Sequence, residues 1–116
     1  MVTVDLRAEP RVSVSCRGTL RLGERSAPCF IQNMCSRGFL IRSSEELPVG
    51  KMLQLRCELD SERTIECSVE VRHVNRDCLG ARVIDMSDDG RILCKRFLEE
   101  QHALQSAGHE TGGPAA

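Results

Sequence analysis

The sequence predicts an all-β domain, a compact antiparallel barrel or sandwich, that is followed by one C-terminal α-helix. Three observations predict it: apolar and polar residues alternate along several segments, turn signals recur at short intervals, and the period becomes helical after residue 87. The chain has 116 residues, enough for one hydrophobic core and too few for two.

Six segments have the alternating or extended pattern of strands. In the first, Val12 and Val14 share one face while Ser13 and Ser15 share the other, as in a half-buried strand. His73 follows a series of inward-facing residues and is expected to be a packed or strand-end residue. The expected strands are 12–22, 28–32, 38–41, 53–59, 65–71 and 78–86, with 33–38 as a polar connection.

The last third of the chain predicts a helix. Ser87 is a suitable N-cap, and Asp88 and Asp89 complement the positive end of the helix dipole. We expect the helix to cover one mouth of the barrel. Its expected apolar face consists of Leu93, Cys94, Phe97, Leu98 and Leu104. Residues 106–116 are rich in small residues and predict a disordered tail, so the folded domain is expected to span 12–105.

The seven cysteines predict free thiols. Their number is odd and no two are spaced as CxxC, which argues against a disulfide framework or a zinc ribbon. Cys16, Cys57, Cys67 and Cys94 fall on apolar faces, where a free cysteine packs as a small hydrophobe. The sequence shows no apolar signal core and no run of eighteen apolar residues, so we expect a cytoplasmic protein without membrane insertion.

Charge and aromatic content narrow the function classes. The formal net charge is −1, and the only aromatic residues besides histidine are Phe30, Phe39 and Phe97. Proteins that bind nucleic-acid polymers usually have a basic excess and aromatic platforms for the bases. We find no catalytic triad, paired catalytic carboxylates or P-loop. The sequence therefore favours a protein that binds a small, discrete ligand over a nucleic-acid polymer binder or an enzyme.

Two segments carry residues suited to an anionic nucleotide. Arg7 and Arg11 flank Pro10, which favours an extended segment, and each guanidinium can bind a phosphate or a guanine edge. Asn33 offers a donor and an acceptor, while Gly38 permits a positive φ or a close backbone approach to a ligand. From these residues alone, a solvated basic pair and an ordinary polar turn remain alternative interpretations.

Together the two segments resemble the signature of the PilZ family, RxxxR followed by (D/N)xSxxG. Here the motifs are Arg7-xxx-Arg11 and Asn33-x-Cys35-xx-Gly38, and the similarity extends over about residues 6–100. The resemblance implies a six- or seven-stranded antiparallel β-barrel with a C-terminal helix. It also implies a receptor for cyclic di-GMP, with residues 1–11 as a flexible N-terminal ligand-binding loop.

The same resemblance assigns roles to the motif residues. Arg7 and Arg11 would contact guanine edges and phosphates, Asn33 would hydrogen-bond a guanine, and Gly38 would leave room for the ligand. No cofactor is expected besides this ligand. A downstream protein partner is expected, in processes such as motility, biofilm formation and virulence.

Cys35 departs from the signature, because the family usually has serine there. A thiol is a weaker hydrogen-bond partner than a hydroxyl, so weaker ligand binding is expected. Two alternatives therefore stay open. The first is a degenerate PilZ adaptor that no longer binds cyclic di-GMP and acts through protein–protein interaction, and the second, suggested by the cysteine count, is a thiol-based redox or metal sensor.

Overall fold

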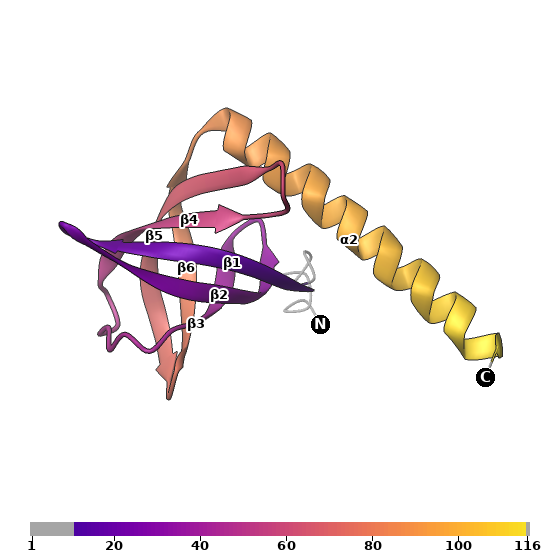
Figure 1. Ribbon diagram of the computed structural model, residues 1–116, viewed down its shortest axis with the longest axis horizontal. Helices are drawn as coiled ribbons and strands as arrows, with labels where there is room; N and C mark the ends of the chain where they lie inside the picture. Colours follow the sequence, from indigo (N-terminus) through magenta and orange to yellow (C-terminus); the bar gives the residue numbers. More distant parts are fainter. Residues whose placement is uncertain (1–10, 116) are drawn as a thin grey trace, which may run out of the picture.

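The computed structural model describes the backbone of residues 11–115 and the side chains of residues 11–105. The described strands pair antiparallel in the closed order β1-β2-β3-β6-β5-β4 (Figure 1). The predicted antiparallel barrel with a C-terminal helix is therefore confirmed, with six strands. The elements are β1 (Val12–Leu22), β2 (Arg25–Cys35), β3 (Gly38–Arg42), β4 (Met52–Glu58), β5 (Thr64–Asn75), β6 (Cys78–Met86) and α2 (Asp88–Ala115).

Strand β1 closes the barrel because it pairs with β2 on one side and with β4 on the other. Gly18 lies at the centre of this arrangement, opposite Cys29 on β2 and Cys57 on β4. A Cβ at Gly18 would lie 2.9 Å from Sγ of Cys29 and 3.0 Å from the carbonyl oxygen of Arg56. The three strands thus approach too closely here for a larger side chain, and closure leaves the sheet without free edges.

The predicted polar connection at 33–38 is wrong. Strand β2 continues to Cys35, and only Ser36 and Arg37 form the turn before β3. The reason is Met34, whose side chain is fully buried in the core and holds this part of β2 in the barrel. The register between β2 and β3 shifts just before Met34, so a β-bulge interrupts the alternation by which a strand is recognised.

The core of the barrel is filled by apolar side chains, with Phe39 the largest fully buried one, and by thiols. Cys16, Cys57, Cys67 and Cys94 are buried in this core, which confirms their predicted packing role. All seven cysteines are free thiols. Burial raises the pKa of Cys67 to about 12 and that of Cys29 to about 11, so both remain protonated at neutral pH.

Helix α2 begins as the sequence predicts. The backbone N–H of Gly90 donates to Oγ of Ser87 at 3.0 Å, and the N–H of Arg91 donates to the Ser87 carbonyl at 2.9 Å. Ser87 is therefore the N-cap, with Asp88 and Asp89 in the first turn.

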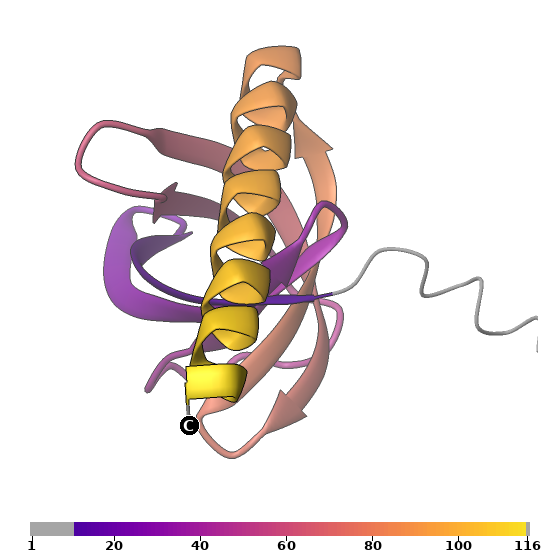
Figure 2. The ribbon, with the colours of Figure 1, turned by 90° about the vertical axis from the view of Figure 1, so that its right-hand side faces the viewer.

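The helix runs across one face of the barrel, as Figure 2 shows. Cys94, Phe97 and Leu98 are buried in the core, as predicted. The prediction was wrong for Leu104, whose side chain is 64% exposed, although the neighbouring Gln105 still contacts β1. The backbone of α2 continues to Ala115, through most of the segment 106–116 that the sequence predicts as a disordered tail.

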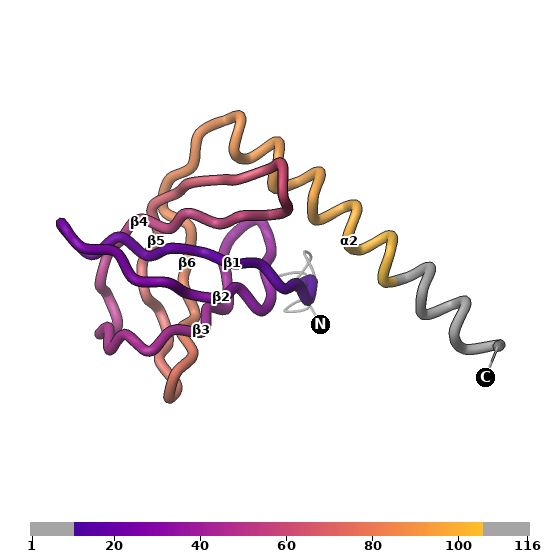
Figure 3. Tube along the Cα trace, in the orientation of Figure 1, coloured from indigo at the N-terminus to yellow at the C-terminus, as the bar shows by residue number. Residues whose placement is uncertain are grey.

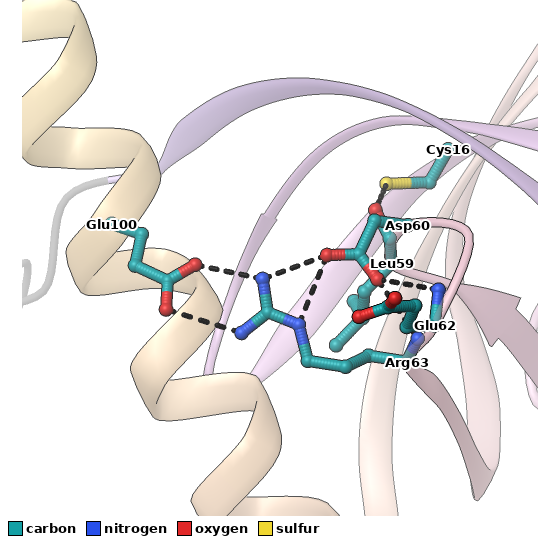
Figure 4. A network of polar contacts seen from close by, with 6 residues as sticks. All are labelled: Cys16, Leu59, Asp60, Glu62, Arg63 and Glu100. Atoms are coloured by element: carbon teal, nitrogen blue, oxygen red, sulfur yellow. Dashed lines mark hydrogen bonds and ion pairs between the residues drawn. The ribbon is translucent and has the colours of Figure 1, made fainter.

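A charged network connects α2 to the β4–β5 hairpin (Figure 4). The guanidinium of Arg63 donates to both carboxylate oxygens of Glu100, at 2.7 and 3.1 Å, and to Oδ2 of Asp60, at 2.8 and 3.0 Å. It also lies 5.6 Å from the ring centroid of Phe97. These hydrogen bonds raise the pKa of Arg63 and lower the pKa of Glu100 and of Asp60. The ion pair thus fixes the middle of α2 against the barrel.

No helix among the described residues combines the length and the apolar character needed to cross a bilayer.

Candidate ligand-binding site

A groove of about 560 Å³ opens on the outside of the barrel, over β3, β6 and β5. It also reaches the residue before β1 and the first turn of α2. Its polar lining is almost entirely cationic, and no Asp or Glu is among the described residues that line it. The cationic and imidazole side chains are Arg11, Arg37, Arg72, His73, Arg82 and Arg91.

Strand pairing explains why arginines far apart in the sequence meet in this groove. Gly38, the first residue of β3, pairs with Arg82 on β6. The backbone N–H of Val83 donates to the carbonyl oxygen of Arg37 at 2.8 Å, which extends the β3–β6 pairing into the turn. Arg37 and Arg82 are both exposed, so the two guanidiniums lie on the same outer surface.

A β-bulge in β5 adds two further side chains to the groove. The register between β5 and β6 shifts between Val71 and His73, and Arg72 is the extra residue. His73 was expected to be packed or at the strand end, but it is exposed within β5 and lines the groove, because the bulge breaks the inward alternation. It pairs with Gly80, where a Cβ would lie 3.0 Å from Cδ2 of the imidazole. Gly80 therefore provides the space that this ring occupies.

Arg11 and Asn33, two of the predicted ligand-binding residues, contact each other directly. Nη1 of Arg11 donates a hydrogen bond to Oδ1 of Asn33 at 3.0 Å. The contact arises because the start of β1 lies beside the end of β2 (Figure 3). In this pairing Ser13 lies opposite Asn33. Arg11 lines the groove, whereas the half-buried Asn33 lies next to it and holds Arg11 in place.

The buried side chain of Cys35 stabilises the turn between β2 and β3. Its side chain is buried, and its Sγ accepts the backbone N–H of Arg37 at 3.4 Å. The thiol is absent from the lining of the groove. In this structure Cys35 therefore positions the turn that carries Arg37.

Gly38 lines the groove, and the positive φ that was one expected reason for glycine at this position is absent. Its φ is not positive, since only Gly23 and Gly50 among the described glycines have positive φ. A Cβ at Gly38 would lie 2.5 Å from the carbonyl oxygen of Ala81 on β6. The absent side chain allows β3 and β6 to approach each other, and its role towards a ligand stays a prediction.

The groove gathers positive charge with little compensation. Nη1 of Arg72 lies 3.7 Å from Oε1 of Glu70. The other four groove arginines form no ion pair with any residue in 11–105; they are Arg11, Arg37, Arg82 and Arg91. Clefts lined by one sign of charge concentrate ions of opposite sign. Planar guanidinium groups bind phosphate oxygens and purine edges through paired hydrogen bonds. The arrangement can therefore bind a small ligand with more than one negative charge and purine groups.

Of the predicted site residues, the structure brings Arg11, Asn33, Cys35 and Gly38 to one end of the barrel, and Arg7 lies outside the described residues. Sequence reasoning missed the rest of the lining that carries charged or imidazole side chains, namely Arg37, Arg72, His73, Arg82 and Arg91. The one available signal was that Arg72 and Arg82 fall on the polar, outward-facing positions of their strands.

Residues 11–105 contain no group of three or more His, Cys, Asp or Glu side chains placed to hold a metal ion.

Comparison with known proteins identifies the family. A family model of the PilZ domain matches residues 5–100. The chain belongs to the PilZ domain family. The resemblance noted in its motifs is therefore confirmed over most of its length.

Solved structures share the fold of this PilZ domain. The PilZ domain of YcgR from Escherichia coli, with c-di-GMP, superimposes with a TM-score of 0.73 at 10% identity, covering 90% of this chain and 97% of that one. The Bacillus subtilis inhibitor of motility MotI/DgrA gives a TM-score of 0.73 at 15% identity, covering 84% of this chain and 51% of that one. The chain thus spans about half the length of MotI/DgrA. A search of curated proteins gives no significant match.

Proposed function

We propose that this PilZ domain is a receptor that binds cyclic di-GMP and relays the level of this messenger to a protein partner. The observation that carries the proposal is the groove beside the PilZ motifs, where five arginines meet without a carboxylate among the described lining residues. The solved PilZ domain of YcgR with c-di-GMP supports the choice of ligand. The proposal assigns no catalytic step to this chain.

The chemistry of the ligand fits the lining. Cyclic di-GMP has two phosphate groups and two guanines, and arginine side chains bind both kinds of group in bidentate geometry. Arg11 donates one N–H to Asn33, which leaves the other donors of its guanidinium for the ligand. Arg37 and Arg82 approach from the turn and from β6 on the same surface. We assign phosphate binding to this group of arginines.

The motif residues have distinct roles in this proposal. Arg7 and Arg11 contact the ligand, and Asn33 accepts from Arg11 through Oδ1 while its amide N–H groups donate to a guanine. Cys35 positions the turn that carries Arg37. Gly38 has no side chain, so none occupies the space over β3 and β6 in which the ligand binds.

A competition experiment tests the proposal. Fluorescently labelled cyclic di-GMP is titrated with the purified domain, and unlabelled cyclic di-GMP or GTP is then added. Displacement by cyclic di-GMP and none by GTP at equal concentration is expected. A folded domain that does not change the polarisation of the labelled ligand would contradict the proposal.

A second candidate is a PilZ adaptor that has kept the fold and lost the ligand. It is favoured by Asn33 and Cys35, because both make internal contacts and neither lines the groove. This candidate predicts no binding of cyclic di-GMP together with a stable complex with another protein. A pull-down from a bacterial lysate, with and without added cyclic di-GMP, separates the two: a partner that is retained regardless of the messenger favours the adaptor.

A further inference from the structure

Helix α2 contributes one arginine to the cationic groove. Arg91 lies one turn after the N-cap Ser87, and it lines the groove together with Arg11, Arg37 and Arg82. Its side chain is exposed and forms no ion pair within residues 11–105. A guanidinium in this state has all its side-chain donors available to an anion. Among the described residues that line the groove, Arg91 is the only one that belongs to α2.

A second cavity lies between α2 and the barrel, next to the first. Its volume is about 640 Å³, and its lining comes mainly from β1, β6 and α2. The apolar part includes Val12, Met86 and Leu98, and the charged part on α2 includes Lys95 and Glu99. Ser36 and Arg91 line both cavities. On α2 the lining extends from Arg91 to Ala103, so unfilled space lies along this face of the helix although Cys94, Phe97 and Leu98 are buried in the core. A small movement of the helix can use this space, since side chains do not fill it.

Gln105, the last residue of α2 whose side chain the structure describes, contacts β1 near the same site. Nε2 of Gln105 donates to the carbonyl oxygen of Ser13 at 2.7 Å, and Ser13 is two residues after Arg11. Between Arg91 and Gln105 the helix rises about 21 Å, at 1.5 Å per residue. Between these two points, Glu100 is fixed by Arg63 (Figure 4). The helix is thus attached at its middle and touches the ligand site, or the strand that leads from it, at two separate points.

We propose that Arg91 binds a phosphate of the ligand and so couples ligand occupancy to the packing of α2 on the barrel. This inference rests on the proposed function, because it requires an anionic ligand in the groove. A phosphate that Arg91 contacts together with Arg11 or Arg82 draws the first turns of α2 towards the barrel. The helix surface is then the part of this PilZ domain that changes with the messenger and that a protein partner can recognise.

Affinity measurements test the binding role of Arg91. Cyclic di-GMP is titrated into the wild-type domain and into Arg91→Ala, Arg91→Lys and Arg96→Ala. Arg96 is a matched control because it is exposed on the same helix and lines neither cavity. Loss of a hydrogen-bonded charge predicts an affinity about tenfold lower for Arg91→Ala. Arg91→Lys is expected to lie in between, since lysine keeps the charge and loses the planar fork, and Arg96→Ala is expected to match wild type.

Amide hydrogen exchange tests the coupling separately from affinity. In the wild-type domain, saturating cyclic di-GMP is expected to slow exchange along residues 91–105. In Arg91→Ala, brought to the same occupancy, this protection is expected to be absent while protection of the β3 and β6 amides remains. Wild-type binding with an unchanged affinity in Arg91→Ala, or equal protection of α2 in both proteins, would overturn the inference and leave the proposed function intact. A wild-type domain that does not bind cyclic di-GMP would overturn both.

Discussion

Nη1 of Arg11 lies 3.0 Å from Oδ1 of Asn33, so the two halves of the PilZ signature, 22 positions apart in sequence, are joined by a side-chain hydrogen bond. The pairing of β1 with β2 creates this contact. It holds one guanidinium at the edge of a groove that already carries four other arginines. Because this bond already restricts the Arg11 side chain, less conformational entropy is lost when Arg11 binds the ligand.

Replacement of Arg11 is expected to weaken ligand binding strongly. Arg11→Ala removes hydrogen bonds to a charged ligand, which are worth about 1.5–3 kcal/mol, or roughly tenfold or more in affinity. Because Arg11 is exposed, the free energy of unfolding is expected to change by less than about 0.5 kcal/mol. Arg17→Ala is the control, since Arg17 is exposed on β1 and does not line the groove. Equal affinities of the two variants for cyclic di-GMP would argue against this site.

Restoring the family residue at position 35 tests the importance of the thiol. In Cys35→Ser a hydroxyl replaces Sγ as the acceptor for the N–H of Arg37, and a shorter, stronger hydrogen bond is expected to hold the turn more firmly. We expect affinity for cyclic di-GMP to rise by up to about tenfold. The measurement is a parallel titration of both proteins; weaker binding in the serine variant would show that the thiol itself is the better partner here.

Gly38→Ala is expected to destabilise the fold. Its Cβ would lie 2.5 Å from the carbonyl oxygen of Ala81, and backbone atoms must move to relieve this contact. Such overpacking costs about 1–3 kcal/mol. Gly80→Ala is the matched comparison, because its Cβ would meet the His73 side chain at 3.0 Å and a side chain can rotate away. Urea unfolding measures both, and a cost for Gly38→Ala no greater than for Gly80→Ala would contradict this explanation.

The network around Arg63 predicts how acid affects stability. Hydrogen bonds from Arg63 lower the pKa of Glu100 and Asp60 in the folded protein. A lowered carboxyl pKa stabilises the fold fully above the unfolded-state pKa of about 4, and this contribution is lost as the pH falls through the lower folded-state pKa. The melting temperature is therefore expected to fall on acidification below about pH 4, and to fall less in Glu100→Gln.

The control for this pH dependence is Glu99→Gln, since Glu99 is exposed on α2 and forms no ion pair within residues 11–105. Melting is followed by circular dichroism at low ionic strength, where exposed ion pairs are least screened. The same acid dependence in Glu100→Gln and wild type would show that the network does not contribute to folding.

The regular strands could be predicted from the sequence, because a half-buried strand leaves an alternating pattern. The bounds of β1 and β6 agree with the prediction, and the cap at Ser87 was recognised from the residue and the two aspartates after it. The end of β2 could not be predicted, since a bulge before the buried Met34 interrupts the alternation.

The groove could be predicted only in part, because the motifs supply one edge of it. Arg11 and Gly38 were recognised from their spacing, whereas Arg37, Arg82 and Arg91 meet only through strand pairing and the position of α2. The exposure of His73 depends on the bulge at Arg72, for which the sequence has no clear signal. Pairing between strands that are distant in sequence thus brings together most of the charged residues of the site.

Isothermal titration calorimetry of the purified domain with cyclic di-GMP, with GTP as the control ligand, tests the central claim most directly. The groove predicts saturable binding in the micromolar range or tighter, with no heat of binding for GTP at the same concentration. The stoichiometry follows from the same titration. A flat titration from a sample that circular dichroism shows to be folded would contradict the claim that this PilZ domain is a cyclic di-GMP receptor.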